Sequence, residues 1–477
     1  MNLKYIFTIL TSVFLLFTAC NDWFDVQPKS LTSEEKLFSR ADGFKESLTG
    51  VYMQLSSPNL YGKTLMYDYL DELAMLRHLA SDNRNIYDFK PENNSTSAIF
   101  RSMYIAISNT NALISWIEKK PEVLAPELKN IIEGEAYGLR GFIYFDLLRM
   151  FGPILSVDPT KTAVPYRTQV EPAAKKPATA KELIESIIAD LLKAETLLKD
   201  DPMNIAFPPG AVASAKSDFL SHRNNRMNKF AVKALLARVY LYKGDKTNAA
   251  KYAQEVIDAK NKDNNVLFDF VEENSNDPIL SNELIFSLNV TEGGEKAFED
   301  MVKKDFSLSA QQDGVYSKFM IEITLLDKIF NVIQDGRNDI RIAAGKGFEV
   351  SSKNAVSMKF RQTNLKSYAL RSTVPVIRLP EMYYILAECT TDMAKASRLL
   401  SQVRSARGLN SLPVFTTSQA RDEMLDIEYR KEFYGEGQYW YFLKRNFKKK
   451  WITYTFEQEM VHENYIFALP TNEIQYK

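Results

Sequence analysis

The stretch LLARVYLYKGDKTNAAKYAQEV, residues 235–256, decides the fold class of this chain. Apolar residues recur in it at helical spacing, both before and after the pair Gly244–Asp245. A glycine followed by an aspartate is a turn signal. We therefore predict two amphipathic helices joined by one turn, which together make a helical hairpin.

The small and aromatic residues of this stretch have the spacing of a tetratricopeptide unit. In such a unit a small residue lets two helices approach and an aromatic ring fills the gap between them. The positions concerned are Leu236, Ala237, Tyr240, Gly244 and Ala249. A second stretch, YYILAECTTDMAKASRLLSQV at residues 383–403, repeats the theme after a shorter turn. Helical hairpins are therefore predicted to recur along the chain.

Long amphipathic segments alternate with stretches of a different composition. The helical scaffold is predicted over residues 40–55, 98–152, 178–260 and 376–446. The intervening stretches are rich in Asn, Asp, Ser, Gly and Tyr, and they cover residues 56–97, 200–225 and about 262–373. They contain short strand candidates such as ELIFSLNV (283–290) and the turn AAGKGFEV (343–350).

Loops held by a rigid scaffold commonly carry binding residues. The stretches 56–97 and 262–373 are therefore predicted to be ligand-binding insertions in a loop-rich region of a mainly α protein. No domain boundary is predicted between residues 20 and 477.

The N-terminal segment predicts export and lipidation. Residues 5–19 are apolar and follow Lys4, but they are fewer than the about 20 residues that a membrane-spanning helix needs. The junction FTAC is similar to a bacterial lipobox, with Phe17 where that pattern prefers Leu. We therefore predict a signal peptide over residues 1–19 and a lipid on Cys20. The alternative is an ordinary secretory signal with an incidental cysteine. The second cysteine, Cys389, is predicted to be an unreactive buried thiol.

Charge and motifs exclude several classes of function. Sixty basic and sixty acidic residues cancel, which gives no reason to expect nucleic-acid binding. The three histidines lie far apart, and the chain has no GxSxG, HExxH or phosphate-binding glycine loop, so no metal, cofactor or catalytic residue is predicted. Asp71 and Glu72 offer two carboxylates, but adjacent helical positions point in different directions. The chain is predicted to bind rather than to catalyse.

Nine segments, in this order, resemble the SusD/RagB family of outer-membrane nutrient-binding lipoproteins of Bacteroidota. They are CNDWFDVQPKS, NTNALI, GEAYGLRGFIYFDLLRMFGPI, IIADLLKAETLL, NKFAVKALLARVYLYKGD, VIRLPEMYYILAE, LLSQVRSARGL, IEYRKEFYGEGQYWYFLKR and IFALPTNEIQ. The chain departs from the family pattern at Gly138 and Gly141, where Ala is commoner.

The resemblance implies a scaffold of about four tetratricopeptide-like helix pairs with an irregular ligand-binding region packed against it. It also implies an outer-membrane lipoprotein, with Asp22 and Asp25 in the acidic neighbourhood that directs such proteins to the cell surface. The implied partner is a SusC-like TonB-dependent transporter, and the implied ligand is an oligosaccharide. An oligopeptide, as in the RagB branch, is the alternative.

Candidate ligand-binding residues are loop aromatics that lie close to amides and charged groups. Aromatic rings stack on a ligand while Asn, Asp and Arg satisfy its polar groups. The first insertion supplies Asp82, Asn83, Arg84, Tyr87, Phe89, Asn93 and Asn94, and the second supplies Tyr316 beside Gln311, Gln312 and Asp313. The four tryptophans all lie outside these loops, so the binding platform is predicted to consist of Tyr and Phe.

Other matching residues are predicted to be structural. Charged residues beside aromatics in helices are expected to form buried or half-buried ion pairs, and Trp440 is expected in the core. The charged residues are Arg140, Arg149, Glu428, Arg430 and Glu432.

Overall fold

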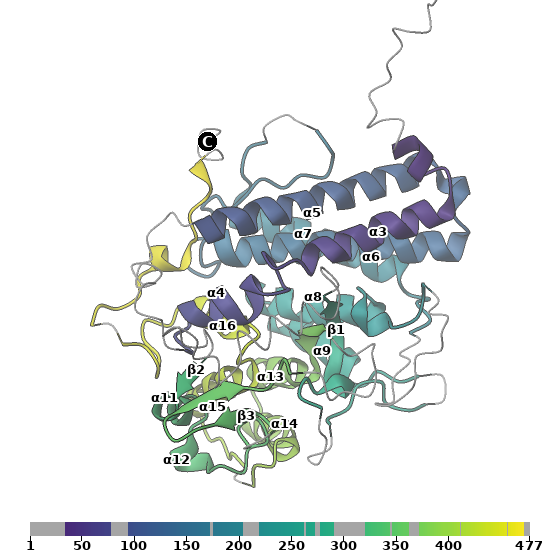
Figure 1. Cartoon of the computed structure of the whole chain (residues 1–477). Helices are drawn as coiled ribbons and strands as arrows, with labels where there is room; N and C mark the ends of the chain where they lie inside the picture. The colour runs from purple at the N-terminus through teal and green to yellow at the C-terminus, as the bar shows by residue number, and fades with distance from the viewer. Residues whose placement is uncertain are drawn as a thin grey trace, which may run out of the picture.

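A computed structural model gives the fold of the chain (Figure 1). The residues that it describes are 34–77, 94–171, 175–203, 219–261, 264–271, 277–290, 320–343, 346–361, 372–410, 412–455 and 457–471.

Four long helices pack together at the top of Figure 1. They are α3 (Ala41–Leu55), α5 (Asn94–Lys119), α6 (Pro126–Phe151) and α7 (Ala180–Leu197). Two glycines let α6 approach its neighbours closely. A Cβ added at Gly138 would lie 2.5 Å from Met227 Cγ, and one added at Gly141 would lie 2.9 Å from Leu191 Cδ2. The two departures from the family pattern therefore have a packing reason.

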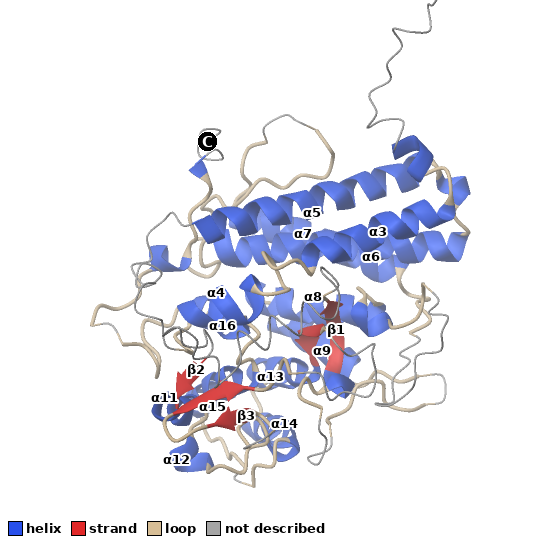
Figure 2. Cartoon of the chain, viewed as in Figure 1, coloured by secondary structure: helices blue, strands red, loops and turns tan. Residues whose placement is uncertain are grey.

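Six further helices form a second group beneath these four (Figure 1). They are α8 (Lys229–Lys243), α9 (Lys246–Ile257), α13 (Leu379–Cys389), α14 (Met393–Ala406), α15 (Ser418–Glu432) and α16 (Gln438–Arg445). Consecutive helices pack as the pairs α5–α6, α8–α9, α13–α14 and α15–α16. The structure confirms a mainly α fold built from helical hairpins (Figure 2).

The predicted hairpin at residues 235–256 is confirmed in detail. Asn228 caps the start of α8 by accepting from the N–H groups of Phe230 and Ala231, and α8 ends at Gly244, whose φ is +88°. Asp245 then caps α9. The rings of Tyr240 and Tyr252 stack between the two helices with their centroids 5.8 Å apart. The local sequence therefore specifies both the turn and the contact across it.

Short strands lie between the helices (Figure 2). β1 (Leu284–Asn289) pairs antiparallel with β5 (Thr373–Arg378), which confirms the strand predicted from ELIFSLNV. The second sheet has the order β2-β4-β3, formed by β2 (Met320–Glu322), β4 (Asn354–Ser357) and β3 (Phe348–Val350). Two short helices, α11 (Ile323–Ile329) and α12 (Val332–Asp335), follow β2.

The first predicted insertion is not a loop throughout. A π-helical turn at Thr64–Asp68 leads directly into α4 (Tyr69–Leu73), and nearly all of the side chains from Leu65 to Leu76 are buried. The Asn, Asp, Ser, Gly and Tyr content of residues 56–97 as a whole suggested a loop-rich insertion. Its polar side chains are instead paired inside the protein, which makes their burial tolerable.

The predicted ion pairs are present. Arg140 pairs with Asp190, Arg149 with Asp146, and Arg430 with Asp426. Glu428 and Glu432 belong to a larger network described below. Trp440 is fully buried, and burial raises the pKa of the half-buried Cys389 thiol to about 12, which keeps it protonated at neutral pH.

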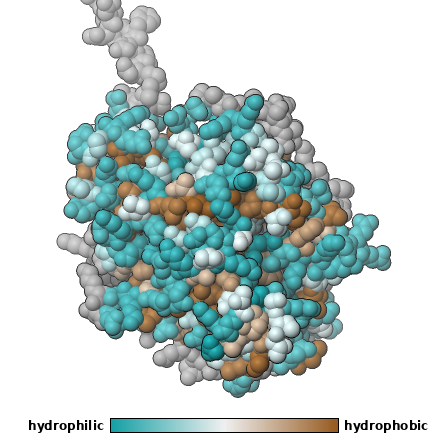
Figure 3. Space-filling view, turned by 180° about the vertical axis from the view of Figure 1, so that it is seen from behind, coloured by the Kyte–Doolittle hydropathy of each residue, from teal (hydrophilic) through white to brown (hydrophobic). Residues whose placement is uncertain are grey.

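The outer surface is mixed in character. The face opposite that of Figure 1 is mainly hydrophilic and carries a band of hydrophobic residues below its upper part (Figure 3). Among the described helices, none combines the length and the apolar composition that crossing a bilayer requires.

Candidate functional site

The residues predicted to bind ligand lie almost entirely outside the described part of the chain. This holds for Asp82, Asn83, Arg84, Tyr87, Phe89, Asn93, Gln311, Gln312, Asp313 and Tyr316, and for Cys20. Asn94 is the first residue of α5. The structure therefore does not test these residues, but it shows how the neighbouring framework is built.

The α4 segment and the residues that follow it up to Arg77 are held by buried polar contacts. Asp71 accepts hydrogen bonds from the backbone N–H groups of Gly435 at 2.5 Å and Gly437 at 3.0 Å. Burial raises the pKa of the Asp71 carboxyl to about 7. Glu72 pairs instead with Arg77, at 2.7 Å. Asp71 and Glu72 thus have separate structural partners, and they do not form the carboxylate pair of a glycosidase.

The turn that holds Asp71 requires glycine. Gly435 and Gly437 have φ values of +81° and +68°, in the left-handed region. A Cβ added at Gly437 would lie 2.4 Å from the Leu65 carbonyl oxygen. The α4 segment is therefore fixed to residues near the other end of the chain.

A largely buried ion network extends from this turn through the lower half of the molecule. Each of its cations pairs with one or more carboxylates, and Arg407, for example, lies 2.6 Å from Glu283 and 2.8 Å from Glu432. The cations are Arg341, Lys359, Arg378, Arg404, Arg407 and Lys431, and the carboxylates are Glu283, Asp335, Asp339, Glu428, Glu432 and Glu436. Their formal charges cancel, so the network has a structural role.

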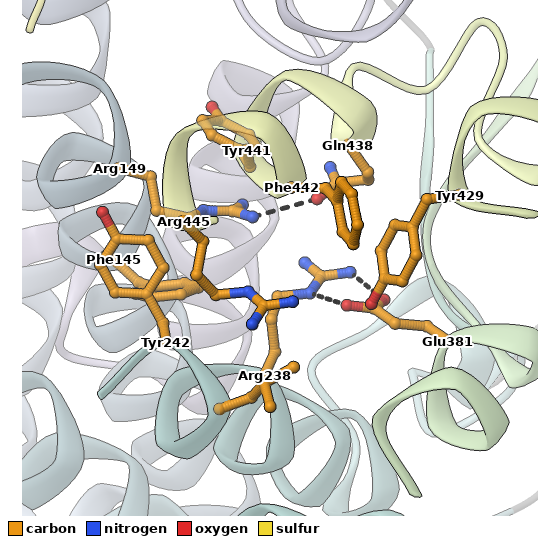
Figure 4. Close-up of a pocket in the computed structure, with 11 residues that line it drawn as sticks. Phe145, Arg149, Arg238, Tyr242, Glu381, Tyr429, Gln438, Tyr441, Phe442 and Arg445 are labelled. Atoms are coloured by element: carbon orange, nitrogen blue, oxygen red, sulfur yellow. Dashed lines mark hydrogen bonds and ion pairs between the residues drawn. The ribbon is translucent and has the colours of Figure 1, made fainter. Parts of the chain in front are cut away.

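A polar cavity of about 30 Å³ lies where α6, α8, α13, α15 and α16 meet (Figure 4). Arg238 makes a bidentate pair with Glu381, at 2.6 and 2.5 Å, and Arg149 donates to Gln438 Oε1 at 3.0 Å. Arg445 also lines the cavity and pairs with Glu388 at 2.6 Å. The volume has room for about one or two water molecules and is too small for a sugar.

A wider cleft, of about 400 Å³, lies beside α3 and the end of β1. We call it the Arg226 cleft. Its volume falls in the range of about 300–1,000 Å³ that is typical of small-molecule sites. The lining residues are Thr49, Tyr52, Met53, Phe219, Ser221, His222, Asn225, Arg226, Leu288 and Asn289.

The wall of the Arg226 cleft is held by buried contacts. The Tyr52 hydroxyl donates to Glu135 Oε2 at 2.6 Å and accepts from the Met227 N–H at 2.8 Å. Glu135 also pairs with Arg223, which is fully buried and makes a second pair with Asp201 at 2.7 Å. These contacts fix the segment that carries Arg226 against α3.

Aromatic rings and a cation meet in this cleft. The Arg226 guanidinium carbon lies 4.7 Å from the ring centroid of Tyr52 and 4.9 Å from that of Phe219, within the range of cation–π contacts. Burial lowers the pKa of His222, which favours its neutral form at pH 7.

The sequence prediction did not include the Arg226 cleft among the binding sites. The segment FLSHRNNR, residues 219–226, has the aromatic, amide and arginine composition that marked the other two insertions. That local signal was available. No local signal indicated that Tyr52 from α3 and Asn289 from β1 would also line the cleft, because their position there depends on tertiary packing.

Two family models match most of the chain. One, described as "Starch-binding associating with outer membrane", matches residues 22–241, and one described as "SusD family" matches residues 342–476. This chain belongs to the SusD/RagB family. The resemblance predicted from nine sequence segments is therefore confirmed.

Individual relatives agree with this assignment. SusD-like protein P2 of Formosa agariphila is 28% identical over 257 residues, which cover 52% of this chain and 45% of that protein. A SusD superfamily protein from Bacteroides thetaiotaomicron has a TM-score of 0.71 at 21% identity, covering 91% of this chain and 98% of its own. A laminarin-binding SusD-like protein has a TM-score of 0.62 at 19% identity, covering 92% and 98%. The two structural similarities show the fold.

Proposed function

We propose that this protein is a cell-surface lipoprotein that binds an oligosaccharide and delivers it to a SusC-like TonB-dependent transporter of the outer membrane. Family membership is the observation that carries the proposal, because the matching family model is described by starch binding and by association with the outer membrane. The lipobox-like junction before Cys20 supports lipid anchoring. The mechanism is binding, with no chemical turnover.

The ligand is proposed to be a glycan and not a peptide. A relative with the same fold is named for laminarin binding, and the family description names starch. The oligopeptide alternative from the sequence has no comparable support.

The proposed ligand face includes the two loops that carry Tyr87, Phe89 and Tyr316. The described residues on either side of residues 78–93 are Arg77, which belongs to the buried framework around Asp71, and Asn94, the first residue of α5. A rigid framework of this kind favours binding, because it lowers the ordering cost of the residues that contact the ligand.

Calorimetry with a panel of oligosaccharides tests the binding part of the proposal. Stacking of one ring buries apolar area worth about 25 cal/mol per Å², so Tyr87→Ala or Tyr316→Ala should weaken binding by about five- to thirtyfold. Both variants should keep the melting temperature within a few degrees of the wild type. Normal binding by both variants would place the ligand elsewhere.

Gentle detergent extraction followed by mass spectrometry tests the partner. We expect a large outer-membrane barrel protein to co-purify with the intact lipoprotein. Extraction that recovers no transporter in any fraction would contradict the delivery role.

A further inference from the structure

We propose that the Arg226 cleft binds an acidic sugar unit, with the carboxylate or sulfate oxygens of the sugar held by the Arg226 guanidinium. The proposal rests on the proposed function, because it names the class of glycan that the protein takes. It concerns a cleft whose lining residues do not include the predicted ligand-binding residues Tyr87 and Tyr316.

The cleft contains a cation with no opposite charge. None of the ten residues that line it is an aspartate or a glutamate. No ion pair among the described residues involves Arg226, and its Nη1 atom is buried without a hydrogen-bond partner among them. A positive charge that no neighbouring carboxylate compensates attracts an anionic group that enters the cleft.

A neighbouring arginine in the same segment differs from Arg226 in its ion pairs. Arg223 lies three residues before Arg226 and is fully buried, and it pairs with both Glu135 and Asp201. Among the described residues, two carboxylates therefore pair with the fully buried Arg223, and none pairs with the half-buried Arg226. We attribute the difference to a ligand that brings its own negative charge.

The geometry of Arg226 suits an oxyanion. Its guanidinium carbon lies within 5 Å of the ring centroids of both Tyr52 and Phe219. A guanidinium held against aromatic faces keeps its N–H donors along its edge, where they match the two oxygens of a carboxylate or sulfate. Lys45 lies 5.8 Å from the Phe219 ring, but its charge is matched by Asp42 at 3.1 Å, so Arg226 remains the uncompensated cation.

The rest of the lining fits a sugar ring. Phe219 and Met53 supply apolar surface for the C–H face of a pyranose, and Ser221 and Asn225 add polar atoms at the cleft. The combination of a stacking surface, polar side chains and one unpaired arginine distinguishes an acidic sugar from a neutral one.

Calorimetry on the intact protein tests this inference with three probes. These are trigalacturonate, which carries carboxylates, a sulfated galactose disaccharide, and the neutral maltotriose. We expect at least one acidic probe to bind more tightly than maltotriose, and the two acidic probes separate carboxylate from sulfate recognition.

Arg226→Gln removes the positive charge and leaves a shorter, neutral polar side chain. It should weaken the binding of the acidic probe about ten- to hundredfold and leave maltotriose unaffected. The matched control is Arg398→Gln, since Arg398 is exposed on α14, which contributes nothing to the cleft. Ser221→Glu gives an independent test, because it places a carboxylate in the cleft and should repel the acidic probes.

Equal binding of acidic and neutral probes by the wild type would overturn the inference, as would unchanged acidic binding by Arg226→Gln. If both variants fail to fold, the affinities of the wild-type protein for the three probes still test the inference. Tight binding of neutral glycans alone would reject this inference while supporting the proposed function. Absence of any glycan binding, together with absence of a transporter partner, would reject the proposed function itself.

Discussion

Replacement of Asp71 by Asn should change how the stability of the protein depends on pH. The two carboxylate oxygens accept from Gly435 and Gly437, at 2.5 and 3.0 Å, in a fully buried position. An amide offers only one acceptor oxygen, so Asp71→Asn leaves one buried N–H without a partner. The expected cost is about 1–3 kcal/mol at pH 5.

The sign of the pH effect follows from the raised pKa. Burial raises the pKa of the Asp71 carboxyl from 3.8 to about 7, so the folded state keeps a proton that the unfolded state has already lost. Its contribution to stability is complete below about pH 4 and is lost as the pH rises through 7. Between pH 5 and pH 7 the loss is about 2 kcal/mol, because half of the folded molecules still hold the proton at pH 7. The Asn variant does not titrate, so its stability should rise relative to the wild type by this amount.

Urea unfolding at pH 5, 6, 7 and 8 measures the difference in unfolding free energy between wild type and variant. Taking the difference cancels the pH dependence of groups common to both, such as Glu432, whose pKa nearby arginines hold well below its usual range. Asp42→Asn is the control, because the Asp42 side chain is 67% exposed and should change stability by less than about 0.5 kcal/mol at every pH. A difference for Asp71→Asn that stays constant from pH 5 to pH 8 would refute the reasoning.

Three further results are expected. Arg407→Met should lower the unfolding free energy by about 3–5 kcal/mol in urea titrations, because it leaves the buried network around Glu283 and Glu432 with one uncompensated negative charge. Retention of wild-type stability would contradict the structural role of the network. Tyr240→Ala should lower it by about 2–5 kcal/mol while glycan affinity stays unchanged, since the Tyr240 ring packs on Tyr252, and a normal melting temperature would argue against that contact. Cys20→Ala should abolish labelling by a clickable palmitate in cells, and equal label on both proteins would disprove lipidation at this residue.

The helical hairpins could be predicted because their signals are local. The turn at Gly244, the cap at Asp245 and the contact of Tyr240 across the hairpin all lie within one short stretch. Buried ion pairs at Arg140 and Glu428 could also be predicted, since charged residues beside aromatics in helices need partners, although the identity of each partner could not. At these positions the neighbouring residues in the sequence were enough to predict a helical hairpin or a buried ion pair.

The buried α4 segment could not be predicted in the same way. Residues 64–77 lie within the stretch 56–97, whose overall composition indicated a loop-rich insertion, and the residues that satisfy Asp71 are separated from it by 364 and 366 positions. Only packing of the two ends of the chain against each other makes this burial possible. The Arg226 cleft also depends on packing of distant segments, because α3, residues 219–226 and β1 each contribute part of its wall.

The sequence by itself determined the mainly α class, the helical hairpins and the membership of the SusD/RagB family, because apolar periodicity and turn residues act over a few positions. The tertiary structure decided which charges are compensated. Arg223 and Arg226 are three residues apart and chemically identical, yet Glu135 and Asp201 reach only the first of them. The free energy of a buried charge depends on which distant groups the fold brings within a few ångströms, and that is a property of the assembled molecule.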